Sequence, residues 1–199
     1  MRQQPDFART VRSLLREELL TAAAELTCAE GWASVTMGKV AARVGVSRQT
    51  VYKEIGSKPE LAEALILAQA DVFAAGVAAM LGVHPEDAVD ALVAAIERTL
   101  TTAQDEPLLK AVLAGAYGEA GELLPLLTTK SDAVLARAVE TLTPLLADGY
   151  PEVKLGEAEW AVCVETSVRL MLSHLVQPTM PVARAVAQMR WVIGRMLRD

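Results

Sequence analysis

The sequence is poor in the residues from which metal and catalytic sites are usually built. Its 199 residues include two cysteines, Cys28 and Cys163, which lie far apart and lack the spacing of a metal-binding motif. The two histidines, His84 and His174, are also far apart, and His174 on an apolar helix is more typical of a core or interface residue. These absences argue against a zinc motif and favour a reduced, cytoplasmic protein without metal or other cofactor.

Long uncharged apolar segments are also missing. No stretch of about 18 such residues occurs, so we expect no membrane span, and residues 1–18 lack the apolar centre of a signal peptide. Aromatic residues make up 4% of the chain and strand-like alternation is absent, whereas apolar residues make up 52%. The composition therefore predicts an all-α protein, built as one large domain or two small ones.

Enzyme motifs are absent as well. The segment GWASVTMGK at 31–39 has a Gly-Lys pair, but Ala33 stands where a phosphate-binding loop requires its first glycine. No Gly-x-Ser-x-Gly motif occurs. We therefore do not expect an enzyme.

Apolar periodicity and helix-stop signals divide the chain into helices. Ser57 and Glu60 form a capping-box pattern, and Pro144 should bend or end the helix that Ser131 caps. The expected helices span residues 10–30, 37–44, 48–55, 57–81, 85–102, 107–117, 131–147, 156–176 and 182–198, with a short apolar piece at 123–127.

Charge is distributed unevenly. Residues 1–60 carry nine Lys or Arg and seven Asp or Glu, giving +2, and residues 61–199 carry ten and eighteen, giving −8. The segment 36–61 has five basic and two acidic residues. A polyanion bound at the N-terminal end would explain this asymmetry, and so would chance.

Two short helices around Gly45 carry the most specific pattern. Their inward residues should pack against Leu19, Leu26 and Leu61, and Ala41 is small where the two axes approach; the inward set is Val40, Val44, Val46, Val51 and Ile55. The outward face of the second helix holds side chains able to contact bases or phosphates: Arg48, Gln49, Thr50, Tyr52 and Lys53. A helix-turn-helix presents its second helix in this way, although an ordinary solvated hairpin has a similar face.

The segment 31–61 strongly resembles the DNA-binding domain of TetR-family transcriptional regulators. The matching features are Gly31, Trp32, Thr36, Val40-Ala41, Gly45-Val46-Ser47, Thr50-Val51-Tyr52, Ser57-Lys58 and Glu60-Leu61. The match covers about residues 12–65. Two positions depart from the family, which usually has Phe where Thr27 and Ile55 stand.

The resemblance implies an N-terminal three-helix helix-turn-helix domain, residues 1–58, and a helical ligand-binding and dimerisation domain, residues 59–199. It implies that Arg48, Gln49, Thr50 and Tyr52, with Lys53 beside them, face the DNA groove. Phosphate contacts are expected from Thr36, Lys58 and Lys39, although Lys39 and Arg43 are equally compatible with plain solvation. Arg9 and Arg12 could contact the DNA backbone or the minor groove.

The family also implies an effector pocket and a two-fold dimer. Candidate pocket residues, each of a kind that more often belongs to plain core, are Met80, Leu108, Val112, Leu113, Tyr117, Trp160 and Cys163. The last two helices are expected to pair with those of a second copy, through Val168, Met171, Leu172, Leu175, Met189, Ile193 and Met196. Few charges fall at inward positions, which favours an apolar effector, and SRQTVYKEIGSK resembles actinobacterial members linked to alkane and fatty-acid metabolism.

The sequence thus predicts a ligand-responsive repressor that binds a near-palindromic operator on double-stranded DNA as a homodimer. The alternative is a helical ligand- or partner-binding module that does not bind DNA. Sequence-selective, salt-sensitive binding to duplex DNA separates the two.

Overall fold

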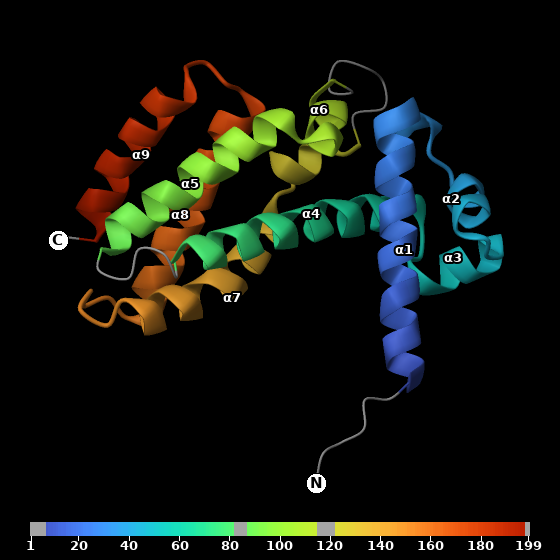
Figure 1. The fold of residues 1–199 in the computed structure, drawn as a ribbon, viewed down its shortest axis with the longest axis horizontal. Coiled ribbons are helices and arrows are strands. Elements are labelled where there is room, and N and C mark those ends of the chain that lie inside the picture. Colours follow the sequence, from blue (N-terminus) through green and yellow to red (C-terminus); the bar gives the residue numbers. More distant parts are fainter. Residues whose placement is uncertain (1–6, 82–86, 115–121, 198–199) are drawn as a thin grey trace, which may run out of the picture. The chain divides into compact units, whose positions relative to one another are not determined.

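The computed structural model describes residues 7–81, 87–114 and 122–197, which form helices and no strand (Figure 1). This confirms the all-α prediction. The chain groups into two compact units: unit 1 comprises residues 1–68 and 107–124, and unit 2 comprises residues 69–106 and 125–199. Helix α4, Lys58–Leu81, begins in unit 1 and ends in unit 2.

Each unit has its own set of helices. Besides the first part of α4, unit 1 contains α1 Phe7–Glu30, η1 Trp32–Ser34, α2 Met37–Val44, α3 Arg48–Glu54 and α6 Pro107–Ala114. Unit 2 contains the rest of α4 with α5 Ala88–Asp105, α7 Asp132–Gly149, α8 Glu157–Val176 and α9 Val182–Met196. The short helix η3, Leu124–Leu127, lies where the chain passes from unit 1 to unit 2.

The core of unit 1 forms where α1 packs against η1, α2, α3 and α6. Its fully buried residues are Leu19, Ala23, Val35, Val40, Val51 and Leu61, and Ala41 and Ile55 are nearly so. Val44, Val46 and Leu26 are half-buried. Thr27 is buried where the family usually has Phe, and its hydroxyl donates to the Ala23 carbonyl at 2.7 Å, so this polar group has a partner inside the core.

The core of unit 2 is larger and includes two aromatic side chains. Helix α7 packs along α8, and α5 packs along α9. Trp160 and Tyr150 are almost fully buried, together with Leu146, Met189 and Ile193. The Tyr150 hydroxyl donates to the Leu81 carbonyl at 3.2 Å, which ties the end of α4 to the loop after α7. Burial of Tyr150 raises the pKa of its hydroxyl.

The structure bears on two local expectations in α7. The helix does not end at Pro144 but continues to Gly149. Pro144 is exposed, while Leu142 and Leu146 are buried on the opposite side and hold the helix across the proline. Ser131 occupies the N-cap position, but its hydroxyl donates to the Thr128 carbonyl at 3.2 Å and does not accept from the helix.

Helix α4 is unusually apolar. An 18-residue window of this helix has a mean hydropathy of 1.9, and by length and composition alone it could cross a membrane. Core helices of water-soluble proteins pass the same test, although 28% of this window is buried here. Asp71, which interrupts its apolar run, forms an ion pair of 3.2 Å with Arg137 of α7. Asp71 therefore has a specific partner within unit 2.

Candidate nucleic-acid interface

Helix α2 ends at a glycine turn and begins at a threonine cap. Gly45 has φ 80°, in the left-handed region that glycine adopts readily. The amides of Gly45 and Val46 both donate to the Ala41 carbonyl, at 2.9 and 3.0 Å, which closes α2. Thr36 caps the other end by accepting from the Lys39 amide at 3.2 Å. The expected bounds of α2 are confirmed.

Helix α3 and the following helix α4 begin with side-chain caps. The Ser47 hydroxyl accepts from the Thr50 amide at 3.0 Å. At the start of α4, Glu60 Oε2 accepts from the Ser57 amide at 2.6 Å and from its hydroxyl at 2.7 Å. These two hydrogen bonds, with the backbone one the larger cause, lower the pKa of Glu60. The predicted capping box is present, and it fixes the chain direction where α3 leads into α4.

Two arginines of α1 hold the C-terminal end of α3. Arg16 Nη1 donates to the Glu54 carbonyl at 2.9 Å, and Arg12 Nε lies 3.3 Å from Glu54 Oε2. A cation is favourable at a helix C-terminus because the last carbonyls carry partial negative charge. Arg12, expected on DNA, is thus part of the support for the candidate reading helix in this structure.

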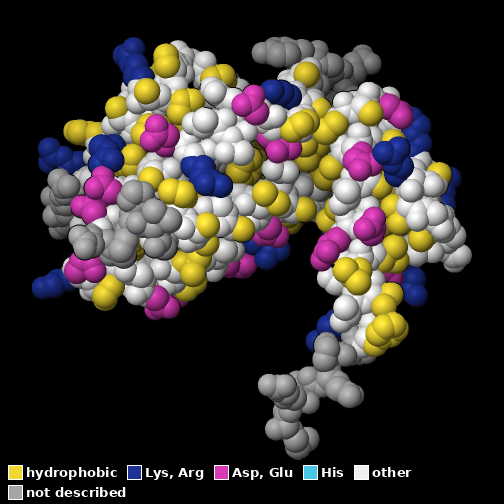
Figure 2. Space-filling model, in the orientation of Figure 1, with side chains coloured by type: hydrophobic (Ala, Val, Ile, Leu, Met, Phe, Trp, Pro, Cys, Tyr) yellow, Lys and Arg dark blue, Asp and Glu magenta, His cyan; other side chains and the backbone are white. Residues whose placement is uncertain are grey.

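The exposed face of α3 presents the predicted groove-facing residues. Arg48, Gln49, Tyr52 and Lys53 are exposed, whereas Thr50 is half-buried and its Oγ1 lies 2.8 Å from Ser47 Oγ. Arg48 Nη2 donates to the Tyr52 hydroxyl at 3.1 Å. Figure 2 shows Lys and Arg side chains along the side of unit 1 where Figure 1 places α2 and α3. This face offers guanidinium, amide, phenol and ammonium groups to a ligand.

The three predicted phosphate contacts have different surroundings. Thr36 is exposed at the N-terminus of α2. The Lys39 ammonium pairs with Glu30 Oε2 at 2.5 Å, and Arg43 likewise pairs with Glu25 at 2.6 Å. Lys58 is half-buried, and its ammonium donates to the Trp32 carbonyl at 3.2 Å.

The predicted effector residues are divided between the two units. Leu108 and Val112 are buried and Leu113 is half-buried in unit 1. Trp160 and Cys163 are buried in the core of unit 2, and Met80 is half-buried there. Tyr117 lies outside the described residues. Burial raises the pKa of the Cys163 thiol to about 11, which keeps it neutral near pH 7. The assignment of these residues to a pocket stays a prediction.

The predicted dimer residues line the inner side of α8 and α9. Met189 and Ile193 are fully buried within one protomer, Leu172 is buried as well, and Val168, Met171, Leu175 and Met196 are half-buried. A second copy could cover the exposed parts of these half-buried side chains together with exposed neighbours on α8 and α9, and their assignment to a dimer interface stays a prediction. Trp191 and Val162 are 67% and 62% exposed. Both are large apolar residues that lie outside the buried apolar face of their helix. An apolar residue outside that face is the sequence signal for an exposed contact surface.

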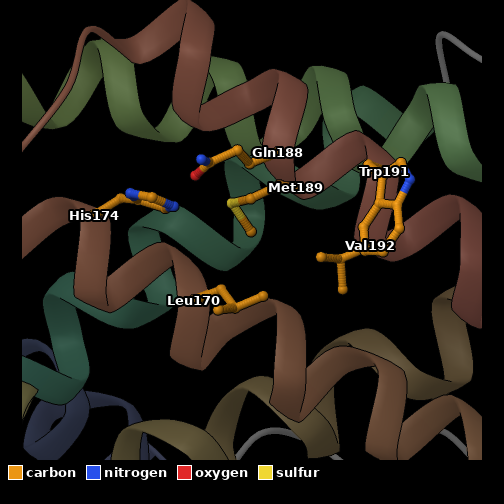
Figure 3. Close-up of a pocket in the computed structure, with 6 residues that line it drawn as sticks. All are labelled: Leu170, His174, Gln188, Met189, Trp191 and Val192. Atoms are coloured by element: carbon orange, nitrogen blue, oxygen red, sulfur yellow. The ribbon is translucent and has the colours of Figure 1, made fainter.

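A hollow of about 330 Å³ lies beside Trp191. Figure 3 shows Leu170 and His174 reaching into it from α8, and Met189 and Val192 from α9. Gln188 and Trp191 complete its lining. The hollow and the indole thus belong to one continuous, mostly apolar surface on unit 2.

The described residues contain no group of three or more His, Cys, Asp or Glu side chains that could hold a metal ion.

Comparison with known proteins identifies the family. A profile for "Bacterial regulatory proteins, tetR family" matches residues 19–65, and one for "Bacterial Tetracyclin repressor, C-terminal domain" matches residues 87–195. The chain belongs to the TetR family of transcriptional regulators, and its helix-turn-helix is the DNA-binding part. This is a family of ligand-responsive regulators, not of enzymes.

Individual relatives agree with this assignment. The chain is 31% identical over 172 residues to the HTH-type transcriptional regulator AlkX of Mycobacterium tuberculosis, covering 86% of this chain and 80% of that one. Its fold matches the crystal structure of the TetR-family repressor AlkX from Dietzia sp., implicated in biodegradation of n-alkanes, with a TM-score of 0.77, 26% identity and coverage of 91% and 96%. It also matches Thermus thermophilus FadR in complex with lauroyl-CoA, with a TM-score of 0.64, 16% identity and coverage of 92% and 95%.

Proposed function

We propose that this protein is a cytoplasmic, non-enzymatic repressor that binds a near-palindromic operator as a homodimer and is released from it by an apolar effector. The DNA-binding part of this proposal rests on the side chains exposed on the outer face of α3. Its capped helix presents Arg48, Gln49, Tyr52 and Lys53 to solvent, with Arg12 and Arg16 holding its far end.

Each exposed group has a distinct task on DNA. Arg48 and Gln49 suit bidentate hydrogen bonds to base edges in the major groove. Tyr52 and Lys53, with Thr36 and Lys58, suit phosphate oxygens, which fix the register of the protein on the duplex. The Thr50 hydroxyl is engaged by Ser47, which favours its methyl group as the contacting part.

A dimer is needed because one such helix covers a few base pairs. Two-fold symmetry repeats the reading helix on a second half-site, about one helical turn of DNA away. The exposed apolar surface around Trp191 on α8 and α9 supports an interface there. Val168, Met171, Leu175 and Met196 would lie behind it, with the buried Met189 and Ile193 as its support.

An apolar effector is supported by the sequence and by the relatives. The core of unit 2 consists of packed apolar side chains, and the AlkX repressor of Dietzia is implicated in n-alkane biodegradation. Helix α4 is the physical route by which such a ligand would act, since it has one end in each unit. The effector must bind the DNA-free state more tightly than the DNA-bound state, because differential affinity alone shifts an equilibrium.

The test is selection of duplexes from a random pool by the full-length protein, followed by a salt series on the enriched sequence. We expect a two-fold symmetric sequence whose complex weakens steeply with salt. A pool without enrichment would favour the module that does not bind DNA. Adding n-alkanes from octane to hexadecane, and separately lauroyl-CoA, to the complex then tests the effector class. If neither compound releases the protein from DNA, the apolar effector is ruled out and the DNA-binding function still stands.

A further inference from the structure

Trp32 lies at the centre of a charged array in unit 1. Its indole N–H donates to Glu122 Oε2 at 2.7 Å, and the Lys58 Nζ atom lies 5.2 Å from the centroid of its ring. The same ammonium donates to the carbonyls of Trp32 at 3.2 Å and Ala33 at 3.5 Å. Trp32 itself is 6% exposed, so the core holds its ring in one position.

The two contacts of the indole strengthen each other. An aromatic ring has a positive edge and a negative face. A hydrogen-bond acceptor at the N–H edge pushes electron density toward the face, and the face attracts the Lys58 cation. Glu122 is therefore linked to Lys58 through the ring.

The array joins distant parts of the sequence. Trp32 and Lys58 fall within residues 19–65, matched by the N-terminal family profile, whereas Glu122 falls within residues 87–195, matched by the C-terminal one. All three residues nevertheless belong to unit 1, where α6 also packs on α1. The C-terminal part of the chain thus supplies a residue that acts on the start of α4.

We propose that Glu122 is a positioning residue for DNA binding. Through Trp32 it holds the Lys58 ammonium on the protein's own carbonyl groups, away from DNA phosphate. Loss of the Glu122–Trp32 hydrogen bond frees the ammonium for a phosphate and strengthens the complex. The inference rests on the proposed function and refines it, because Lys58 is taken to reach a phosphate fully only once its ammonium is released from the protein's own carbonyl groups.

Three variants of the full-length protein separate the hydrogen bond from the charge. Glu122→Ala removes both. Glu122→Gln removes the charge but leaves an amide oxygen that accepts from the indole, and Trp32→Phe removes the N–H donor but leaves a ring under Lys58. Glu63→Ala, at an exposed position of α4, controls for the loss of one negative charge in unit 1.

The first readout does not involve DNA. Brief acylation with acetic anhydride, read by peptide mass spectrometry, gives the reactivity of Lys58 relative to the exposed Lys53 in the same sample. We expect Glu122→Ala and Trp32→Phe to raise this ratio several-fold, and Glu122→Gln and Glu63→Ala to leave it near the parent value. An unchanged ratio in Glu122→Ala, or an equal rise in Glu122→Gln, would overturn the inference. Since Glu122 is exposed, its variants give this answer even where Trp32→Phe fails to fold.

The second readout is the salt dependence of binding to the duplex enriched by the parent protein. Each Lys58 that reaches a phosphate steepens the slope of log affinity against log salt by about 0.9, hence by about 1.8 for a dimer. We expect this steepening in Glu122→Ala and its loss when Lys58→Ala is added. If the parent protein enriches no duplex, the proposed function is wrong, and this inference is wrong with it. If the parent protein binds a duplex but the salt slope is no steeper in Glu122→Ala, only this inference is wrong.

Discussion

Arg48 and Tyr52 lie one helical turn apart on the exposed face of α3, with the guanidinium carbon of Arg48 5.4 Å from the centre of the Tyr52 ring. The guanidinium also donates to the Tyr52 hydroxyl. The tyrosine therefore supports the arginine along its length and limits the positions that its planar head can take. A side chain restrained in this way loses less conformational entropy when it binds a base.

Replacing either residue should have a different effect on DNA recognition. Arg48→Ala should lose about 1–3 kcal/mol of discrimination at particular base pairs. Tyr52→Phe keeps the ring and should retain most of that discrimination, while Tyr52→Ala should weaken binding to all sequences. Titration of each variant against singly substituted duplexes measures both quantities. Uniform weakening by Arg48→Ala would assign this arginine to phosphate.

The left-handed turn at Gly45 provides a stability test with an internal control. Gly45→Ala places a Cβ on a residue with φ 80° and should destabilise unit 1 by about 1–2 kcal/mol. Gly38 lies inside α2, where a Cβ would meet Thr36 Oγ1 at an ordinary 3.8 Å, so Gly38→Ala should stabilise by about 0.4–1 kcal/mol. Urea unfolding of both variants gives the comparison. If both substitutions change the free energy of unfolding in the same direction, the positive φ of Gly45 does not explain why glycine is needed there.

Trp191 should dominate dimer formation if the α8–α9 surface is the interface. A buried tryptophan at an interface centre contributes about 2 kcal/mol or more, so Trp191→Ala should raise the dimer dissociation constant at least roughly thirtyfold. Val72→Ala, at a position 64% exposed on α4, removes exposed apolar surface elsewhere and should have little effect. Sedimentation over a concentration series measures both. A dimer of unchanged affinity in Trp191→Ala would place the interface elsewhere.

The buried thiol of Cys163 should make stability decline at alkaline pH. Burial raises its pKa from about 9 to about 11 in the folded state. The stability contributed by the neutral thiol is fully present below about pH 9 and is lost as the pH rises toward 11, because mainly the unfolded chain ionises in that interval. The loss is on the order of 2–3 kcal/mol.

Urea unfolding at pH 8 and pH 10.5 checks this for the parent and for Cys163→Ala. Tyr150, whose pKa is also raised by burial, is present in both proteins, so the difference between them isolates the thiol. We expect the parent to lose more stability than the variant across this interval. Equal losses would assign the alkaline sensitivity to other groups.

Local signals in the sequence predicted the helix-turn-helix well. The caps and turns of this motif depend on contacts within four residues, made by Thr36, Gly45, Ser47 and Ser57. The local sequence pattern was therefore enough to predict them. Pro144 shows the opposite case, because the sequence left open whether it bends or ends its helix. A proline ends a helix in isolation, but tertiary packing of buried residues around it decides the outcome here.

Contacts between residues far apart in the chain could not be predicted from a single sequence. Nothing around Trp32 indicates that its indole binds Glu122, ninety residues away. The division of α8 and α9 into buried and exposed faces also depends on which neighbouring helices cover them. Met189 and Trp191 are two residues apart and both apolar, yet one is 1% exposed and the other 67%.

The sharing of α4 between the two units affects how this regulator can be recombined with its relatives. Leu61 and Leu65 of α4 are buried in unit 1, beyond a boundary drawn after residue 58. A chimaera cut there would remove part of the core that supports the DNA-reading head. A junction after Ala68 keeps those leucines but loses α6, which packs on α1. Exchange of heads between such proteins therefore calls for two crossover points, and specificity should evolve more readily by substitution on α3 than by domain shuffling.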